Sequence, residues 1–283
     1  MTVVAFGSVR SCGLTTVALA VAATWPSERR VLLVEGDPAG GTLAAASEWP
    51  AEPGLVSLAA SARRGGDPGL VWEHCQRLPG DAAVLAAPAL GEQARNALGM
   101  LGPLLGRLGE LDGDVLIDCG RLDPGSPGVA LWERAERSLL VVRPRLADLQ
   151  ALASWAETRS LDRRSGLVTV GDGPYLDGEI TEALGLEVLA RIPWDPDVAE
   201  VLTSVPASGR QIRLAPLVRA ARTLADRLSL DPAAVVAAGG GAEATGSKGV
   251  GRAVGAVGSR VWRPWRIDAA PHSNGDVPEE AER

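Results

Sequence analysis

The residues best suited to chemistry lie near the start of the chain, in a turn of small residues between two apolar runs. A strand-like run at 2–6 leads into the segment 7–13, and an uncharged helical run begins at Leu14. A strand, a small-residue loop and a helix form the layout in which backbone N–H groups and a helix N-terminus bind phosphate. The sequence therefore predicts a phosphate-binding loop, with the candidate contacts Arg10, Ser11, Cys12, Gly13, Leu14, Thr15 and Thr16.

The predicted loop lacks a lysine. In the motif G-x-x-x-x-G-K-[ST], the lysine reaches the β- and γ-phosphates and the hydroxyl binds Mg²⁺. With Gly13 as the second glycine, Leu14 occupies the lysine position and Thr15 the hydroxyl position. A hydrogen bond to a charged group contributes about 1.5–3 kcal/mol, and no nearby lysine replaces it, because Lys248 is the only one in the chain. We predict a degenerate loop without efficient ATP hydrolysis, and whether ATP still binds stays open.

Two acidic turns accompany the loop. The apolar run 31–34 ends in Glu35 and Asp37, and the apolar run 115–117 ends in Asp118. Such runs are typical of buried parallel strands, whose carboxyl ends meet at one edge of a sheet. Because phosphoryl transfer needs groups that hold Mg²⁺ and orient water, these three carboxylates are the candidate catalytic residues. The alternative is that they serve only as turn and cap residues.

Other interpretations of this site also stay open. If a magnesium nucleotide binds, Thr15 and Asp118 are the candidate metal ligands; otherwise Thr15 and Thr16 are ordinary helix-capping residues. Cys12 and Cys119 follow strands that would be neighbours in the sheet. A redox-sensitive pair is one hypothesis for these cysteines, and two small residues that fill tight turns is the other.

Composition limits the class of protein. Of the 283 residues, 46% are hydrophobic, which suffices for a large core, and the formal charge is −7. This negative charge argues against general nucleic-acid binding, so DNA binding is not indicated. The three cysteines form no CxxC pair, which fits a reducing cytoplasm. Because no apolar run reaches the about 18–20 residues of a membrane-spanning helix, we expect a cytoplasmic protein.

Strand-like and helix-like segments alternate over residues 1–231, which we expect to form one domain. The expected strands are 2–6, 31–34, 83–88, 114–120, 138–144, 166–170 and 186–193, and the expected helices are 14–25, 42–48, 68–77, 91–111, 146–159, 179–184, 198–204 and 215–230. Apolar strands that alternate with helices predict an α/β fold of the P-loop NTPase-like (Rossmann-like) kind. In such a fold, a mostly parallel sheet is covered by helices on both faces.

Beyond about Ala233 this alternation stops. We expect residues 232–283 to form a flexible Gly/Ala-rich tail, because this composition cannot bury enough apolar surface to offset its ordering entropy. The segment 244–267 carries basic residues and two tryptophans, and its valines recur at steps of three and four, the pattern of an interfacial amphipathic helix. A merely solubilising linker is the alternative. The expected contacts with an anionic membrane or a protein partner are Lys248, Arg252, Arg260, Trp262, Arg263, Trp265 and Arg266.

With these segments in this order, the chain resembles the ParA/MinD family of deviant-Walker ATPases over about residues 1–230. The turn Glu35–Gly40 is similar to that family's D-x-D-P-x-G turn, and Asp114–Asp118 is similar to its Walker B strand. The segment Ile192–Asp195 and the helices expected after it resemble the C-terminal third of MinD. The resemblance implies the fold of that family and a crevice for ATP and Mg²⁺.

The chain departs from the family pattern at the residues that would bind phosphate and support hydrolysis. The family's second lysine would stand at Val9, so both of its lysines are absent, and Glu35 replaces the first aspartate. The family includes degenerate members, the CpaE/TadZ-like proteins that mark the site of pilus assembly, and this chain is similar to them. The resemblance implies a pseudo-ATPase that positions or scaffolds protein partners in cell division, chromosome partitioning or pilus assembly.

Three alternatives follow for cofactor and partners. The leading one has no cofactor and binds the protein partners of a positioning or assembly machine, as a cytoplasmic homodimer that contacts the inner face of the cell membrane through its tail. The second is an active MinD-like ATPase, in which ATP and Mg²⁺ drive dimerisation and membrane binding. The third is a soluble regulator that binds another small ligand in the crevice.

Overall fold

The computed structural model of the chain describes residues 2–26, 28–63, 67–78, 81–159, 161–203 and 214–230. These residues belong to one compact unit. The predicted tail at 232–283, with its basic segment at 244–267, lies outside the described residues, so its contact with a membrane or a partner stays a prediction. None of the described helices is long and apolar enough to cross a membrane.

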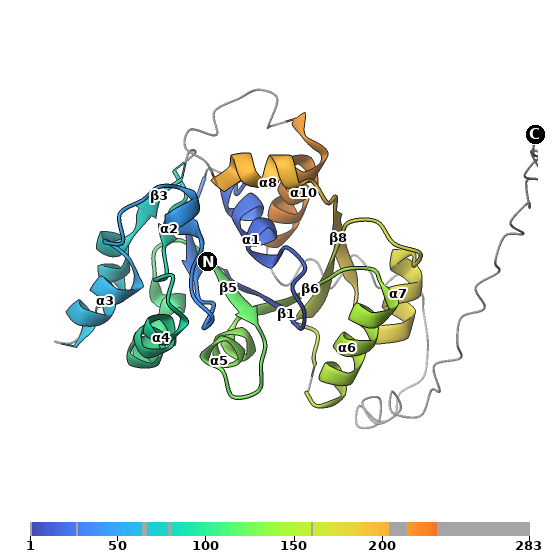
Figure 1. Ribbon diagram of the computed structural model, residues 1–283, viewed down its shortest axis with the longest axis horizontal. Coiled ribbons are helices and arrows are strands. Elements are labelled where there is room, and N and C mark those ends of the chain that lie inside the picture. Colours follow the sequence, from blue (N-terminus) through green and yellow to red (C-terminus); the bar gives the residue numbers. More distant parts are fainter. Residues whose placement is uncertain are drawn as a thin grey trace, which may run out of the picture. The chain divides into compact units, whose positions relative to one another are not determined.

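One eight-stranded sheet forms the centre of the fold, in the strand order β3-β4-β2-β5-β1-β6-β7-β8 (Figure 1). Neighbouring strands are parallel except β3 and β4, which are antiparallel. The strands are β1 (Val3–Ser8), β2 (Val31–Glu35), β3 (Gln76–Arg77), β4 (Ala83–Leu85), β5 (Asp114–Arg121), β6 (Arg137–Val142), β7 (Ser165–Val170) and β8 (Val188–Ile192). This order confirms the predicted P-loop NTPase-like α/β fold with a mostly parallel sheet.

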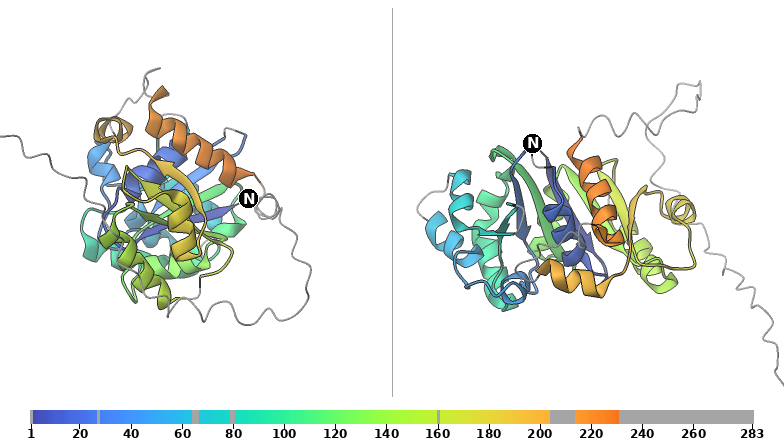
Figure 2. Two further views of the ribbon diagram at one scale, coloured as in Figure 1. Left: turned by 90° about the vertical axis from the view of Figure 1, so that its right-hand side faces the viewer. Right: turned by 90° about the horizontal axis from the view of Figure 1, so that it is seen from above.

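Helices cover both faces of the sheet, as predicted. In Figure 1, α1, α8 and α10 lie on one face, and α4, α5 and α6 lie on the other. Figure 2 agrees and shows α10 beside α1, with which it is in contact. The helices are α1 (Leu14–Ala23), α2 (Leu43–Ala46), α3 (Leu55–Ala62), α4 (Gly91–Leu105), α5 (Pro127–Arg134), α6 (Leu146–Glu157), α7 (Asp177–Leu184), α8 (Pro196–Thr203) and α10 (Pro216–Ser229), with 3₁₀ helices at Pro68–His74 and Leu108–Glu110.

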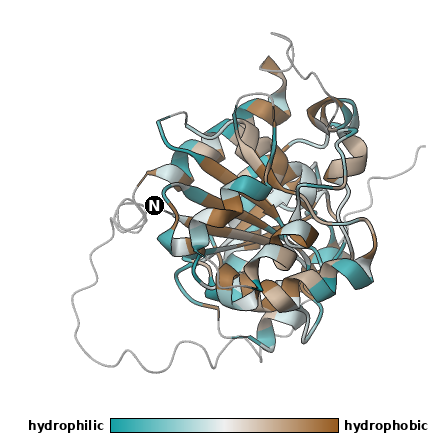
Figure 3. Cartoon of the chain, turned by 90° about the vertical axis from the view of Figure 1, so that its left-hand side faces the viewer, coloured by the Kyte–Doolittle hydropathy of each residue, from teal (hydrophilic) through white to brown (hydrophobic). Residues whose placement is uncertain are grey.

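The helix that follows the loop, α1, is buried over most of its surface. Residues 17–22 are all buried, and α1 contacts both the sheet and α10. An uncharged helix is therefore expected here, because a charge would be costly to bury. Helix α10 instead has one apolar side, where Leu217, Leu224 and Leu228 are buried as their spacing predicted. Figure 3, coloured by hydropathy, shows mostly hydrophobic strands in the centre and helices of mixed hydropathy around them.

Two segments differ from the sequence-based expectation. The helix predicted at 68–77 is a 3₁₀ helix followed by β3, because Gln76 and Arg77 pair with β4. Helix α5 was not expected, since its first residues, Pro127 and Gly128, interrupt a helical pattern. Proline nevertheless fits the first helical position, where the missing N–H has no partner to lose.

Candidate nucleotide crevice

The loop after β1 turns the chain sharply into α1. Gly13 is the N-cap of α1 and has a φ of 87°, in the left-handed region that favours glycine. No side chain caps this helix, so the predicted capping role of Thr15 and Thr16 is wrong. The physical reason is that both threonines lie inside the first turn, after the N-cap position. The first N–H groups of α1 have no intrahelical partner and are available to an anion.

A cavity of about 370 Å³ lies at the N-terminus of α1, within the range of small-molecule sites. The loop contributes Ser8, Ser11, Cys12, Gly13, Leu14, Thr15 and Thr16, and the turn after β2 contributes Asp37, Pro38 and Ala39. The rest of the lining is Arg95 on α4 and the residues Gly120, Arg121, Asp123 and Ser126 at and after the end of β5. The predicted loop residues therefore meet in one crevice, with the exception of Arg10.

Arg10 is directed to another part of the surface. Its Nε lies 3.9 Å from Oδ1 of Asp148 on α6, and its side chain is 58% exposed. It lines a small cavity of about 10 Å³ together with Cys12 and residues of β6. Arg10, the positively charged residue of the loop, thus does not line the large crevice.

Leu14 fills the lysine position with an apolar side chain. It is the first residue of α1, is 7% exposed, and belongs to the hydrophobic core between α1 and the sheet. It also lines the crevice, so no ammonium group stands at this point of the wall. A triphosphate would lose here the charge-assisted contact that the loop motif normally provides.

Glu35, at the end of β2, has a structural task. Its carboxylate is 1% exposed and accepts N–H bonds from Thr42 (2.6 Å) and Leu43 (3.0 Å) at Oε1 and from Ala87 (2.9 Å) at Oε2. Burial raises the pKa of Glu35, although the three N–H bonds oppose this shift. Because all three contacts go to the backbone of the fold, Glu35 has a structural role here, and its predicted vestigial catalytic role stays a prediction. It joins β2 to the start of α2 and to the end of β4.

Asp118, near the end of β5, is as buried as Glu35, but only one of its two carboxylate oxygens has a hydrogen-bond partner in the part of the chain that the structure describes. Oδ1 accepts the Gly120 N–H at 2.9 Å, whereas Oδ2 has no hydrogen-bond partner among the described residues. Burial raises the pKa of Asp118 to about 7, and the nearby Thr15 hydroxyl and the Gly120 N–H oppose this shift. Thr15 lies near the carboxyl group without a hydrogen bond to Oδ2.

Asp118 does not itself line the crevice, but its unpartnered Oδ2 and the nearby Thr15 hydroxyl, which does line it, are oxygen groups that suit a divalent cation or its bound water. Oxygen ligands of this kind suit Mg²⁺, which would neutralise phosphate charge if a nucleotide binds. Within the described ranges, no cluster of three His, Cys, Asp or Glu side chains could hold a metal. Asp118 and Thr15 would therefore hold Mg²⁺ only together with oxygens of a ligand or water.

Asp37 faces the crevice from the turn after β2. Its Oδ1 accepts the Ala39 N–H at 2.7 Å, and burial raises its pKa while that N–H and the Arg121 guanidinium oppose the shift. Gly120 has a φ of 63°, and a side chain there would overlap the Asp37 carboxylate. The turn after β2 and the end of β5 are thus fitted closely to each other.

Two arginines in the crevice were not predicted from the sequence. Arg95 reaches it from α4 and donates from Nη1 to the Pro38 carbonyl at 3.0 Å. Arg121 follows Gly120 at the end of β5. Arg121 follows the predicted Walker B strand directly, so the sequence could have indicated that it lies near the site. The sequence around Arg95 gives no such indication. The crevice is therefore lined by two positively charged side chains, although neither belongs to the phosphate loop.

The two cysteines predicted as a possible redox pair are buried and free. Cys12 donates from Sγ to the Val141 carbonyl at 3.2 Å, and burial raises its pKa to about 12. Burial also raises the pKa of Cys119 well above its usual value. Since the thiolate is the reactive form, these surroundings favour the space-filling role of both thiols.

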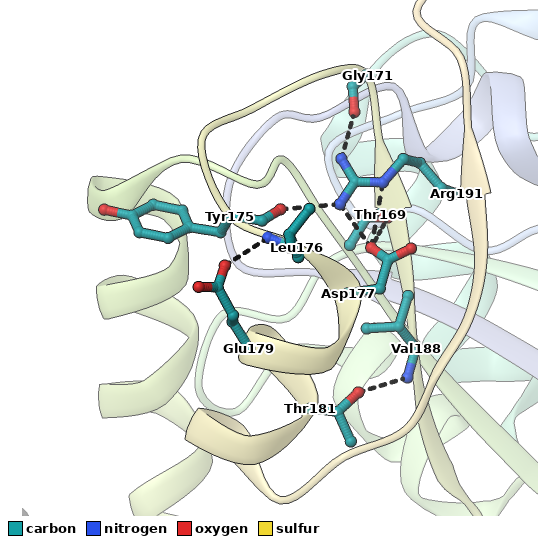
Figure 4. Close-up of polar contacts among 9 residues, drawn as sticks. All are labelled: Thr169, Gly171, Tyr175, Leu176, Asp177, Glu179, Thr181, Val188 and Arg191. Carbon is teal, nitrogen blue, oxygen red and sulfur yellow. Dashed lines mark hydrogen bonds and ion pairs between the residues drawn. The ribbon is translucent and has the colours of Figure 1, made fainter.

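Arg191 of β8 holds the turn that follows β7, outside the lining of the crevice. Its guanidinium bonds to Asp177 Oδ1 from Nε (3.1 Å) and Nη2 (2.5 Å), and to the carbonyls of Gly171 (3.2 Å) and Tyr175 (3.0 Å) (Figure 4). This turn contains the Gly-Pro-Tyr sequence at 173–175. At least four hydrogen bonds fix this turn to β8, so its conformation is preorganised.

Trp194 packs between this turn and the phosphate loop. Its ring is 54% exposed, and the Arg143 guanidinium lies 4.2 Å from the ring centroid. A side chain at Gly13 would lie 3.3 Å from this ring, so the tryptophan packs against the phosphate loop. The residues 143, 171 and 194, which follow three different strands, thereby lie together beside the phosphate loop.

A parallel sheet with a small-residue loop before α1, and with carboxylates at the ends of β2 and β5, defines the P-loop class of nucleotide-binding folds. Within this class, the fold is that of the ParA/MinD family ATPases. The structure is similar to a ParA family ATPase from Chlorobium tepidum TLS, with a TM-score of 0.65 and 19% identity over 79% of this chain and 98% of the other. No protein-family profile and no curated protein matches the sequence.

Two further structures show the same fold. One is the MinC:MinD cell division protein complex of Aquifex aeolicus, with a TM-score of 0.55 and 14% identity over 82% of this chain and 96% of the other. The other is the septum site-determining protein MinD of Pyrococcus horikoshii OT3 complexed with Mg-ADP, with a TM-score of 0.53 and 17% identity over 81% and 96%. At these identities the likeness is one of fold.

Proposed function

We propose that this chain is a ParA/MinD-like spatial-positioning or scaffold protein that does not hydrolyse ATP efficiently. The observation that carries the proposal is the buried Leu14 at the lysine position, in a loop that otherwise keeps the shape of a phosphate cradle. Val9 stands where the family's second lysine would be. Two charge-assisted contacts are worth about 3–6 kcal/mol, and about 1.4 kcal/mol changes a rate tenfold. The absence of both lysines therefore implies turnover that is slower by about two to four orders of magnitude.

The function of such a protein lies in its partners. In the Aquifex structure, MinD with this fold is found in a complex with MinC. We propose that this chain likewise binds protein partners, as a homodimer, at a septum, a partitioning complex or a pilus or secretion site. We also propose that the segment 244–267 contacts anionic lipid at the inner face of the membrane.

A second candidate function is that of a nucleotide-dependent switch. The unpartnered Oδ2 of Asp118 and the nearby Thr15 hydroxyl support it, because oxygen groups of this kind suit Mg²⁺. The MinD structure from Pyrococcus horikoshii contains Mg-ADP. In this alternative, Mg-nucleotide binding drives dimerisation and membrane contact.

Phosphate release by the purified full-length chain at saturating Mg-ATP separates the two candidates. A scaffold is expected to release no more phosphate than its Asp37→Ala variant, since Asp37 is the only predicted catalytic carboxylate that lines the crevice. Turnover of at least about 1 per second, a usual lower value for enzymes, that is lost in the Asp37→Ala variant would establish the active ATPase instead.

A further inference from the structure

We infer that Arg121 is a ligand-binding residue of the crevice and provides, from β5, the positive charge for phosphate that the loop lacks. The inference rests on the proposed function, a nucleotide fold without efficient turnover, and adds that the crevice still binds phosphate. The ligand class is a phosphate chain, as in a nucleoside diphosphate or triphosphate.

The position of Arg121 results from an irregularity between β1 and β5. Phe6 pairs with Asp118, but Ser8 pairs with Arg121, so two steps along β1 correspond to three steps along β5. Side chains alternate along a regular strand, which would direct Asp118 and Arg121 to opposite faces. One extra residue, as in a β-bulge, redirects the side chains that follow it. Arg121 consequently lines the crevice opposite Ser8, at the start of the phosphate loop.

Gly120 makes this irregularity possible. Its φ of 63° lies in the left-handed region, and the Asp37 carboxylate occupies the space that a side chain would need. The extra residue of β5 is thereby fitted against the acidic turn. Arg121 lies close enough to Asp37 to lower the pKa of that carboxyl, against the larger effect of burial.

Arg121 is available to a ligand. The residue is exposed, and within the described part of the chain its guanidinium makes no hydrogen bond and no ion pair, whereas its backbone carbonyl accepts the Asp123 N–H. Arg95 instead donates to the Pro38 carbonyl, and Arg10 is directed to Asp148. Arginine carries five N–H donors in a planar fork that matches two oxygens of one phosphate.

The charges around the crevice favour a phosphate chain bound with a cation. Its charged lining residues are two arginines and two aspartates, Arg95, Arg121, Asp37 and Asp123. A free polyanion would be repelled by the aspartates, whereas a divalent cation beside Asp118 would offset them. Phosphate oxygens would then lie between the N-terminus of α1 and the Arg121 guanidinium.

Isothermal titration of the full-length chain with Mg-ADP, Mg-ATP, pyrophosphate and inorganic phosphate tests this assignment. We expect Mg-ADP or Mg-ATP to bind, and Arg121→Ala to weaken that binding at least tenfold. Arg121→Lys should retain part of the affinity, because the charge remains but the fork is lost. Arg163→Ala, which removes an exposed arginine on the loop before β7, should bind like the unchanged chain. Circular dichroism confirms that each variant is folded.

Equal affinities of the unchanged chain and folded Arg121→Ala would overturn the inference, as would the absence of binding by every phosphate compound tested. Pyrophosphate binding as tight as that of Mg-ADP, with the same loss in Arg121→Ala, would support it and assign the contact to the phosphates alone. The proposed function is judged separately by phosphate release. Fast turnover that depends on Arg121 would overturn the proposed function and support the inference.

Discussion

The ends of β2 and β5 each carry a buried carboxylate, and the two differ in how well they are satisfied. Glu35 and Asp118 are both 1% exposed. Glu35 accepts three backbone N–H bonds, whereas Asp118 accepts one from Gly120 and leaves Oδ2 without a partner in the described part of the chain. Buried polar atoms are normally hydrogen-bonded. The comparison indicates that Glu35 stabilises the fold, and the unpartnered oxygen of Asp118 supports the proposal that this group meets a ligand.

The difference also explains how a nucleotide fold persists without its loop lysines. Glu35 connects β2 with α2 and β4 by N–H bonds that need no nucleotide. Gly41 allows this approach, because a side chain there would overlap the Glu35 carboxylate. The acidic turn therefore has a structural reason to remain even when ATP hydrolysis is lost.

Removal of the Glu35 carboxylate is expected to have the largest effect. Glu35→Ala leaves three N–H groups without their acceptor, and each unsatisfied buried group costs about 1–3 kcal/mol. We expect the free energy of unfolding to fall by about 3 kcal/mol or more in urea titrations. Glu157→Ala, at an exposed glutamate of α6, is the control and should change stability little.

Glu35→Gln is a more conservative change at the same position. Its amide keeps one acceptor oxygen, so we expect a smaller loss than in Glu35→Ala. If Glu35→Ala unfolds at the same urea concentration as the unchanged chain, the structural role assigned to Glu35 is wrong, and the contrast with Asp118 disappears.

Asp118 should give stability a distinct pH dependence. Its pKa of about 7 in the folded chain lies above the usual value of 3.8, so between these values the folded state holds more protons than the unfolded state. Stability therefore falls as pH rises through this window, by at most about 1.4 kcal/mol per pH unit, and levels off above it. In Asp118→Asn this contribution is absent, and urea titrations from about pH 4.5 to 8 should show a flatter profile.

Asp112→Asn is the matched control for that measurement, because Asp112 is exposed shortly before β5. Its profile should follow that of the unchanged chain. An unaltered slope in Asp118→Asn would contradict the account of Asp118 as a desolvated carboxyl group.

The smallest effect is expected at Thr15. Its hydroxyl does not cap α1, so Thr15→Val should change the free energy of unfolding by less than about 0.5 kcal/mol. Asp67→Ala provides the comparison, because the Asp67 carboxylate does cap a 3₁₀ helix by accepting the Gly69 N–H at 3.0 Å. A capping residue of this kind is worth about 1 kcal/mol. Equal losses in the two variants would restore the capping interpretation of Thr15.

Much of the fold could be predicted from the sequence, because apolar strand runs and amphipathic helices are local signals. The loop at Gly13 and the acidic ends at Glu35 and Asp118 were found in the same way, from residue types at fixed spacing. Arg95 could not be found, since only the packing of α4 brings it to the turn after β2. The place of Arg121 after the predicted Walker B strand could be seen in the sequence, but its direction depends on one extra residue in the pairing of β5 with β1, which no local pattern reveals.

The roles of the site residues were harder to predict than their positions. A threonine at a helix start resembles a cap until the helix boundary is known, and here Gly13 occupies that position. The task of Glu35 likewise depends on the N–H groups of Thr42, Leu43 and Ala87, of which the last is distant in sequence. Partners of this kind are defined by tertiary structure.

The affinity of Leu14→Lys for Mg-ATP, measured by calorimetry beside the unchanged chain and Leu14→Met, tests the central claim most directly. If the loop is degenerate because Leu14 removed its cation, the lysine variant should bind at least about tenfold more tightly, since a charge-assisted bond is worth about 1.5 kcal/mol or more. The methionine variant should bind like the unchanged chain. A folded Leu14→Lys variant with no gain in affinity would contradict the account.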